Sequence, residues 1–96
     1  MARATTEIRT PQASIYLQQL CKHWSHKFEV TFSPTEGRIP FSSGAVCTLA
    51  AADGVLKLVV ETPTAEELPR MEGVVINHLK RFAHREDLGD PAWREA

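Results

Sequence analysis

The sequence predicts an α+β domain in which two helices cover one face of a five-stranded antiparallel sheet, in the order β-α-β-β-β-β-α. Three observations carry this prediction. Residues 3–10, RATTEIRT, alternate apolar and polar side chains as a half-buried strand does. Two later segments repeat apolar residues every three or four positions, as amphipathic helices do. Between them, Asp53-Gly54 separates two apolar runs, which is a strong hairpin signal. This order of elements buries both helices on the same side of the sheet.

The first helix is expected to run from Thr10 to about Ser25. Thr10 can act as the N-cap, and Pro11 suits the first helical position, where an N–H would have no partner inside the helix. The apolar stripe predicted for this helix comprises Ala13, Tyr16, Leu17, Leu20, Cys21 and Trp24.

Four strands are expected after this helix. They are KFEVTFS (27–33), RIPFSS (38–43), AVCTLAA (45–51) and VLKLVVET (55–62). Pro40 cannot donate a hydrogen bond to a neighbouring strand, so its strand is expected to be short or to lie at an edge. The side chains expected to face the core are Phe28, Val30, Phe32, Ile39, Phe41, Cys47, Leu49, Leu56, Leu58 and Val60.

The start of the second helix is indicated by Thr64 and Glu67, which have the spacing of a capping box. Pro69 would interrupt a helix that began at Thr64, so we expect either a separate first turn or a helix that starts near Leu68. The helix is expected to end near His84. Its predicted apolar stripe is Leu68, Met71, Val75, Leu79 and Phe82.

Composition and charge narrow the classes of function. The 96 residues predict one domain, with a core over residues 3–85 and a tail over residues 86–96. A formal net charge of −1, with acids and bases balanced on the outward sheet face, predicts no nucleic-acid partner. The chain has no apolar run typical of a signal peptide or a membrane span, so we expect a cytoplasmic protein without membrane contact. Cys21 and Cys47 lack metal-site spacing and are expected to be reduced core thiols. The outward face leaves room for a modest contact, which predicts a monomer or a weak homodimer through that face.

The stretch CKHWSHK, residues 21–27, is the first candidate site. On a regular helix His23 and His26 lie about 60° apart and could share a metal ion, whereas Cys21 and His23 lie about 200° apart and could not. The alternative interpretation is that the histidines and lysines here complement the negative end of the helix dipole.

The second candidate site is NHLKRFAHRE, residues 77–86. His78 falls inside the apolar arc of the second helix, so we expect a half-buried imidazole that needs a hydrogen-bond partner. It could be a core histidine with one such partner, or a ligand or proton-transfer residue in a cleft between the helices. The sequence has no phosphate-binding loop, nucleophile elbow, C-x-x-C pair or H-E-x-x-H motif, so no catalytic residue is predicted.

These observations lead to two hypotheses. The first is a non-catalytic module that binds a small anionic ligand or a protein partner through His23, His26, Lys27, His78 and Arg81. The second is a zinc or iron protein that uses His23 and His26, with the question of an enzymatic role left open. The third metal ligand would then come from His78, Glu29 or Glu86.

Three segments, YLQQLCKHWSHKFEV, GRIPF and INHLKRFAHRE, resemble a small bacterial family catalogued as domain of unknown function 2218. The resemblance spans roughly residues 3–88. It implies the fold and a bacterial cytoplasmic setting, and it brings no established activity. It also favours a specific use of the imidazoles, because dipole complementation would accept lysine or arginine instead. GDPA, residues 89–92, interrupts a region that is usually extended in the family, which argues against a final strand. The positions that match are His23, His26, Lys27, His78, Arg81, Phe82, Arg85 and Glu86.

Overall fold

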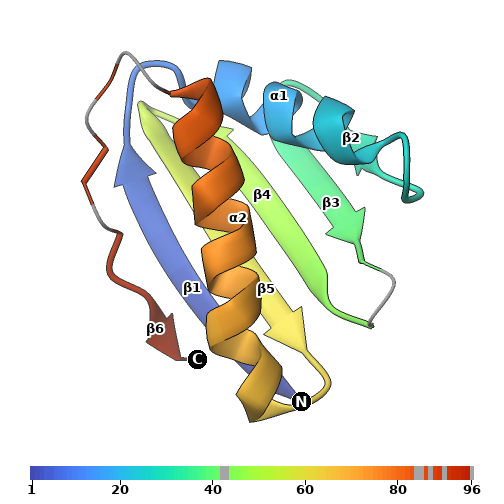
Figure 1. Cartoon of the computed structure of the whole chain (residues 1–96). Helices are drawn as coiled ribbons and strands as arrows, with labels where there is room; N and C mark the ends of the chain where they lie inside the picture. Colours follow the sequence, from blue (N-terminus) through green and yellow to red (C-terminus); the bar gives the residue numbers. More distant parts are fainter. Residues whose placement is uncertain (42–43, 84–85, 87, 90, 96) are drawn as a thin grey trace.

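The computed structural model describes residues 1–41, 44–83, 86, 88–89 and 91–95, and it shows two helices packed on one face of an antiparallel sheet (Figure 1). The sheet order is β2-β3-β4-β5-β1-β6. The α+β class and the side taken by the helices are therefore confirmed. No helix in the described part of the chain is long and apolar enough to span a membrane. The elements are β1 (Ala2–Arg9), α1 (Ala13–Trp24), β2 (Thr31–Phe32), β3 (Glu36–Pro40), β4 (Val46–Ala52), β5 (Val55–Thr62), η1 (Ala65–Glu67), α2 (Leu68–Phe82) and β6 (Arg94–Glu95).

The prediction of five strands is wrong, because Arg94–Glu95 in the tail form a sixth strand. β6 pairs antiparallel with β1, with Thr5 opposite Arg94. The hydroxyl of Thr6 donates a hydrogen bond to the carbonyl of Ala92 at 2.9 Å and fastens the chain just before β6. Two paired residues are too few to produce a periodic pattern, so this strand depends on tertiary contacts that the local sequence does not encode.

The helix starts differ in detail from the predictions. α1 begins at Ala13, because the hydroxyl of Thr10 accepts a hydrogen bond from the N–H of Gln12 in the turn before the helix. The separate first turn before Leu68 is confirmed as η1, but neither Thr64 nor Glu67 forms a side-chain cap. The expected end at His84 lies outside the described residues, and α2 ends at Phe82. All members of the first predicted stripe are buried, as are those of the second except the half-buried Phe82.

The strand expected over residues 27–33 shrinks to Thr31–Phe32. After α1 the chain continues in turns, and the N–H of Phe28 bonds to the carbonyl of Trp24 at 3.0 Å. Phe32, expected in the core, is therefore 39% exposed at the edge of the sheet. The strand expected over residues 38–43 runs from Glu36 to Pro40 and is short, as expected. The end of β3 that holds Pro40 extends past the two-residue β2, so the missing N–H of Pro40 leaves no donor unpaired there.

The hairpin between β4 and β5 is confirmed. Asp53 and Gly54 both adopt positive φ angles, 51° and 73°, as a two-residue type I′ turn requires.

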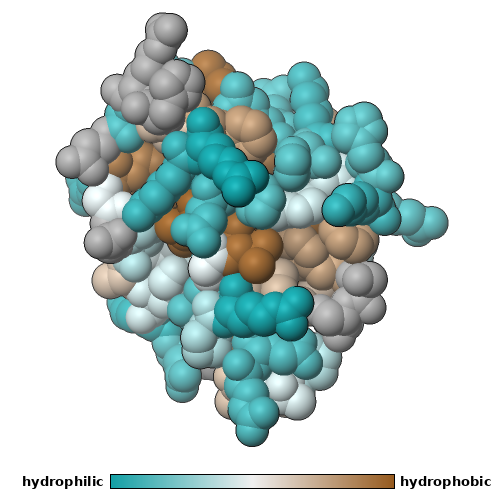
Figure 2. All heavy atoms as spheres, viewed as in Figure 1, coloured by the Kyte–Doolittle hydropathy of each residue, from teal (hydrophilic) through white to brown (hydrophobic). Residues whose placement is uncertain are grey.

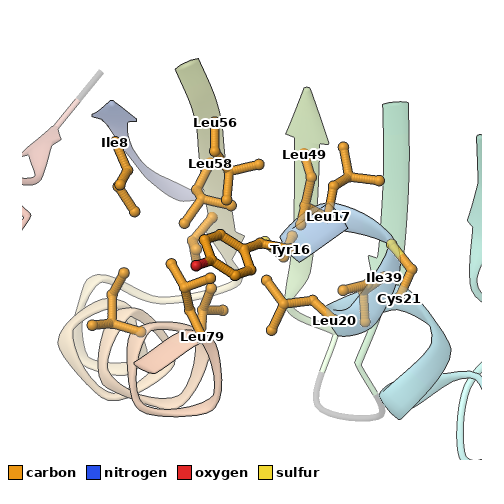
Figure 3. Close-up of a cluster of buried hydrophobic side chains, with 14 of the residues drawn as sticks. Ile8, Tyr16, Leu17, Leu20, Cys21, Ile39, Leu49, Leu56, Leu58 and Leu79 are labelled. Carbon is orange, nitrogen blue, oxygen red and sulfur yellow. The ribbon is translucent and has the colours of Figure 1, made fainter. Parts of the chain in front are cut away.

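The core lies between the helices and the sheet, where side chains of α1, α2 and four strands interdigitate (Figure 3). Gly37 of β3 permits the close approach of α1, because a Cβ at that position would lie 2.7 Å from Sγ of Cys21. Cys21 and Cys47 are buried free thiols, as predicted. Burial raises the pKa of the Cys21 thiol to about 11 and that of Cys47 further still, which makes both weak nucleophiles.

Candidate functional site

The two candidate segments meet where α1 packs against α2. The ring centroid of His23 lies 5.0 Å from that of His78 and 5.9 Å from that of Phe82. Trp24 lies 4.6 Å from His78, again between ring centroids. The imidazoles that the sequence places 55 positions apart are thus neighbours, and we call His23, His26, Lys27, His78 and Arg81 the junction cluster.

His78 is half-buried, as its place in the apolar arc predicted. Its Nδ1 lies 2.7 Å from the carbonyl oxygen of Val74, one turn earlier in α2, so Nδ1 carries the proton and donates. In the neutral ring Nε2 then holds a lone pair that can accept a hydrogen bond or bind a metal ion. The structure therefore supplies the expected partner for this imidazole and leaves its second nitrogen available for chemistry.

The end of α1 bears on the interpretation based on the helix dipole. The carbonyl of Cys21 accepts from the N–H of Ser25, and that of Trp24 accepts from the N–H groups of Lys27 and Phe28, all at 3.0 Å. The carbonyl of Lys22 accepts from the hydroxyl of Ser25 at 2.7 Å. Because these carbonyls already have partners, the nearby cations are not needed to satisfy them.

The electrostatic setting of His23 is positive. Partial desolvation lowers the pKa of His23 below its usual value of 6.5, and the positive charges of His78, Arg81, Lys27 and His26 lower it further. Among the described residues, the charges that shift the pKa of His23 thus have the same sign. The residues of the junction cluster therefore create a positive potential around His23. All of them except His78 are exposed.

The geometry expected for a metal pair does not hold. α1 ends at Trp24, so His26 lies beyond the helix and the angular relation calculated for a regular helix does not apply. Glu86 is engaged elsewhere, because it accepts hydrogen bonds from Tyr16 at 2.7 Å and Thr10 at 3.1 Å. Glu29 is exposed in the loop before β2 rather than in a strand. Within the described ranges no three His, Cys, Asp or Glu side chains are placed to hold a metal ion.

Sequence reasoning missed two features near the cluster. Trp24 was expected only as a core residue, yet it links the imidazole of His78 to Phe41, whose ring centroid lies 5.2 Å away. The hydrogen bond between Tyr16 and Glu86 was also missed. That carboxylate raises the pKa of Tyr16 to about 12 and ties the tail to α1. A tyrosine inside an apolar stripe was the available signal, because a buried hydroxyl needs a partner.

The comparison with known proteins agrees with this architecture. The sequence profile of a family described as "Uncharacterized protein conserved in bacteria (DUF2218)" matches residues 5–94. The chain belongs to this family. The chain is also similar to PA4090 from Pseudomonas aeruginosa, whose NMR structure is matched with 39% sequence identity and a TM-score of 0.80. The likeness covers 98% of this chain and 96% of that one. No curated protein matches the chain.

Proposed function

We propose that this DUF2218 domain is a non-catalytic binding module, and that the junction cluster binds a small oxyanion such as phosphate or a carboxylate. One observation carries the proposal: two positive groups of α2 and two from the turn after α1 act on His23, and among the described residues no carboxylate opposes them in shifting its pKa. Arg81 offers a planar fork of N–H donors that matches two oxygens of an oxyanion. Lys27 adds a mobile point charge from the turn after α1.

Binding at this site is coupled to proton uptake. The positive neighbours disfavour the imidazolium form of His23, and a bound anion offsets that repulsion. The pKa of His23 therefore rises when the anion binds, and by linkage the anion binds more tightly as the pH falls through this range. The face of the molecule that the helices cover is mostly hydrophilic, with hydrophobic residues showing between the hydrophilic ones (Figure 2).

The proposal is tested by NMR titration of the whole chain with inorganic phosphate. We expect the ring C–H signals of His23 and His78 to move, and the pKa of His23 to rise as phosphate saturates the site. Arg81→Gln should weaken phosphate binding severalfold, whereas Arg70→Gln, an exposed cation at the start of the same helix, should leave it unchanged. A His23 pKa that does not respond to phosphate would refute the site.

A second candidate, a zinc or iron site, is favoured by one specific observation. The rings of His23 and His78 lie close together at 5.0 Å, and Nδ1 of His78 is held by Val74, so the Nε2 lone pair has a fixed direction. On this alternative His23 and His78 form the metal pair. It differs from the anion site in that its ligands must be neutral imidazoles rather than cations.

A further inference from the structure

The face of the sheet that the helices leave uncovered holds a hollow of about 620 Å³ over β2, β3, β4 and β5. This volume falls within the range of small-molecule pockets, roughly 300–1,000 Å³. The hollow and the junction cluster lie on opposite faces of the sheet, because alternate residues of each strand point in opposite directions. We call this hollow the open-face groove, and a ligand there would bind independently of the junction cluster.

The register of the strands explains why the face is concave here. Ala50 of β4 lies between Glu36 of β3 and Lys57 of β5 in one row across the sheet. In the next row Thr48 lies between Arg38 and Val59. Small side chains on β4 thus form the floor, and long side chains on the flanking strands form the walls.

The groove combines an apolar floor with an anchor for an anion. Val59 and Ala50 form the apolar floor, and Val59 is 8% exposed although the helices pack on the other face. Arg38 is flanked in register by Thr31 and Thr48, so two hydroxyl groups lie on either side of its backbone position on the same face. Lys57 adds a second cation, but its other cross-strand neighbour is the acidic Glu7, so Arg38 is the stronger anchor.

From this arrangement we propose that the open-face groove binds a small molecule with one carboxylate and an apolar body. The carboxylate would pair with Arg38 and the adjacent hydroxyls, because a guanidinium fork matches two carboxylate oxygens. The apolar body would lie over Ala50 and Val59, which both line the hollow. With Arg38 and Lys57 against Glu36, the lining carries one excess positive charge, which matches a monoanion.

A second copy of the chain is a poorer occupant for this surface. Two concave faces related by a two-fold axis would enclose a void between them, and close packing is what stabilises such an interface. The sheet edges are also unsuited to strand addition, because both edge strands have only two residues and Pro40 lacks an N–H.

The test uses 4-phenylbutyrate as the probe and its neutral amide, 4-phenylbutyramide, as the matched control, with amide NMR signals of the whole chain as the readout. We expect phenylbutyrate to shift the signals of Thr31, Arg38, Thr48 and Val59, and the amide to bind about tenfold more weakly because it cannot use the charge of Arg38. Arg38→Gln should weaken phenylbutyrate binding about tenfold, and Lys57→Gln should weaken it less.

The control variants separate loss of the groove from loss of the fold. Arg3→Gln removes a cation from the same face but outside the groove, and it should leave binding unchanged. Ala50→Leu should fill the floor and abolish binding while the melting temperature stays close to that of the parent. Equal binding of carboxylate and amide, or shifts confined to the helix face, would overturn the proposal. So would shifts of the groove signals on dilution alone, which would show a second copy in the groove.

Discussion

The indole of Trp24 and the imidazole of His78 lie with their ring centroids 4.6 Å apart at an angle of 44°, so a side chain of α2 with a polar edge rests on the core of α1. The ring of His78 therefore contributes packing between the helices in addition to any role in binding. The bond from its Nδ1 to Val74 adds to the stability of α2, but the carbonyl of Val74 can also accept from the main chain one turn later.

His78→Ala should therefore lower the free energy of unfolding by about 1–2 kcal/mol, mainly through lost packing against Trp24. Thermal and urea melts measure this change. Asn77→Ala, at the exposed neighbouring position, is the matched control and should change stability by less than about 0.5 kcal/mol. If His78→Ala melts like the parent, the contact with Trp24 contributes little to stability.

The lowered pKa of His23 predicts a pH dependence of stability with a definite sign. The unfolded chain holds the proton more tightly than the folded one, so stability is lost as the pH falls from the usual pKa of 6.5 through the lower folded value. His23→Gln should flatten the plot of unfolding free energy against pH in this window, whereas Lys22→Gln should leave its slope unchanged. An unchanged slope in His23→Gln would contradict the positive setting of this imidazole.

Glu72 of α2 should show the opposite sign. Partial desolvation raises its pKa, and the negative charge of Glu95 in β6 raises it further. The folded state then favours the protonated form, so stability present at acid pH is lost as the pH rises through the folded pKa. Glu72→Gln should be more stable than the parent at pH 7 and equal to it at low pH, as melts at both pH values would show. Glu66→Gln, an exposed carboxylate in η1, should bring no such gain.

Alanine substitutions at two glycines are expected to change stability in opposite directions, and the first of them tests the close contact between β3 and α1. Gly37→Ala places a methyl group against Sγ of Cys21 and should destabilise the protein by about 1–3 kcal/mol. Cys21→Ala removes that sulfur atom, so the double variant should lose less than the sum of the single losses. Gly73→Ala in α2, where a Cβ meets nothing within 4 Å, should stabilise the protein by up to about 1 kcal/mol. Denaturant melts of all four variants test the argument, and strict additivity would contradict it.

Metal analysis distinguishes the two candidates for the junction cluster. If the anion proposal is right, phosphate should bind equally well before and after treatment with a chelator. If the metal alternative is right, untagged protein incubated with zinc or iron should retain near-stoichiometric metal and lose it in His23→Ala and His78→Ala. Elemental analysis after dialysis gives the answer, and Lys22→Gln is the control that should behave like the parent under either outcome.

Much of the fold follows from periodicity. The stripe from Ala13 to Trp24 and the alternation in β4 and β5 report burial directly, because each side chain's direction is set by the local backbone. Periodicity fails where the element ends early. The strand expected from residue 27 begins only at Thr31, and α1 ends at Trp24, before His26.

The candidate site could be predicted only in its parts. The apolar arc of α2 placed His78 correctly at a half-buried position. Because a half-buried imidazole needs a hydrogen-bond partner, the sequence also predicted that His78 has one. That His78 meets His23 depends on how the two helices pack, and a single sequence carries no local signal for that contact. The open-face groove likewise arises from the register of three strands, which brings Ala50 between two long side chains.

The pairing of β1 with β5 affects how the domain folds during synthesis. Ala2 lies opposite Thr62, and the two positions are separated by most of the domain. During translation β1 leaves the ribosome before β5, so it has no β5 partner until the hairpin of β4 and β5 has emerged. The first eight or so residues of the fold are thus among the last to be secured, and closing so long a loop slows folding relative to a helical bundle of the same size.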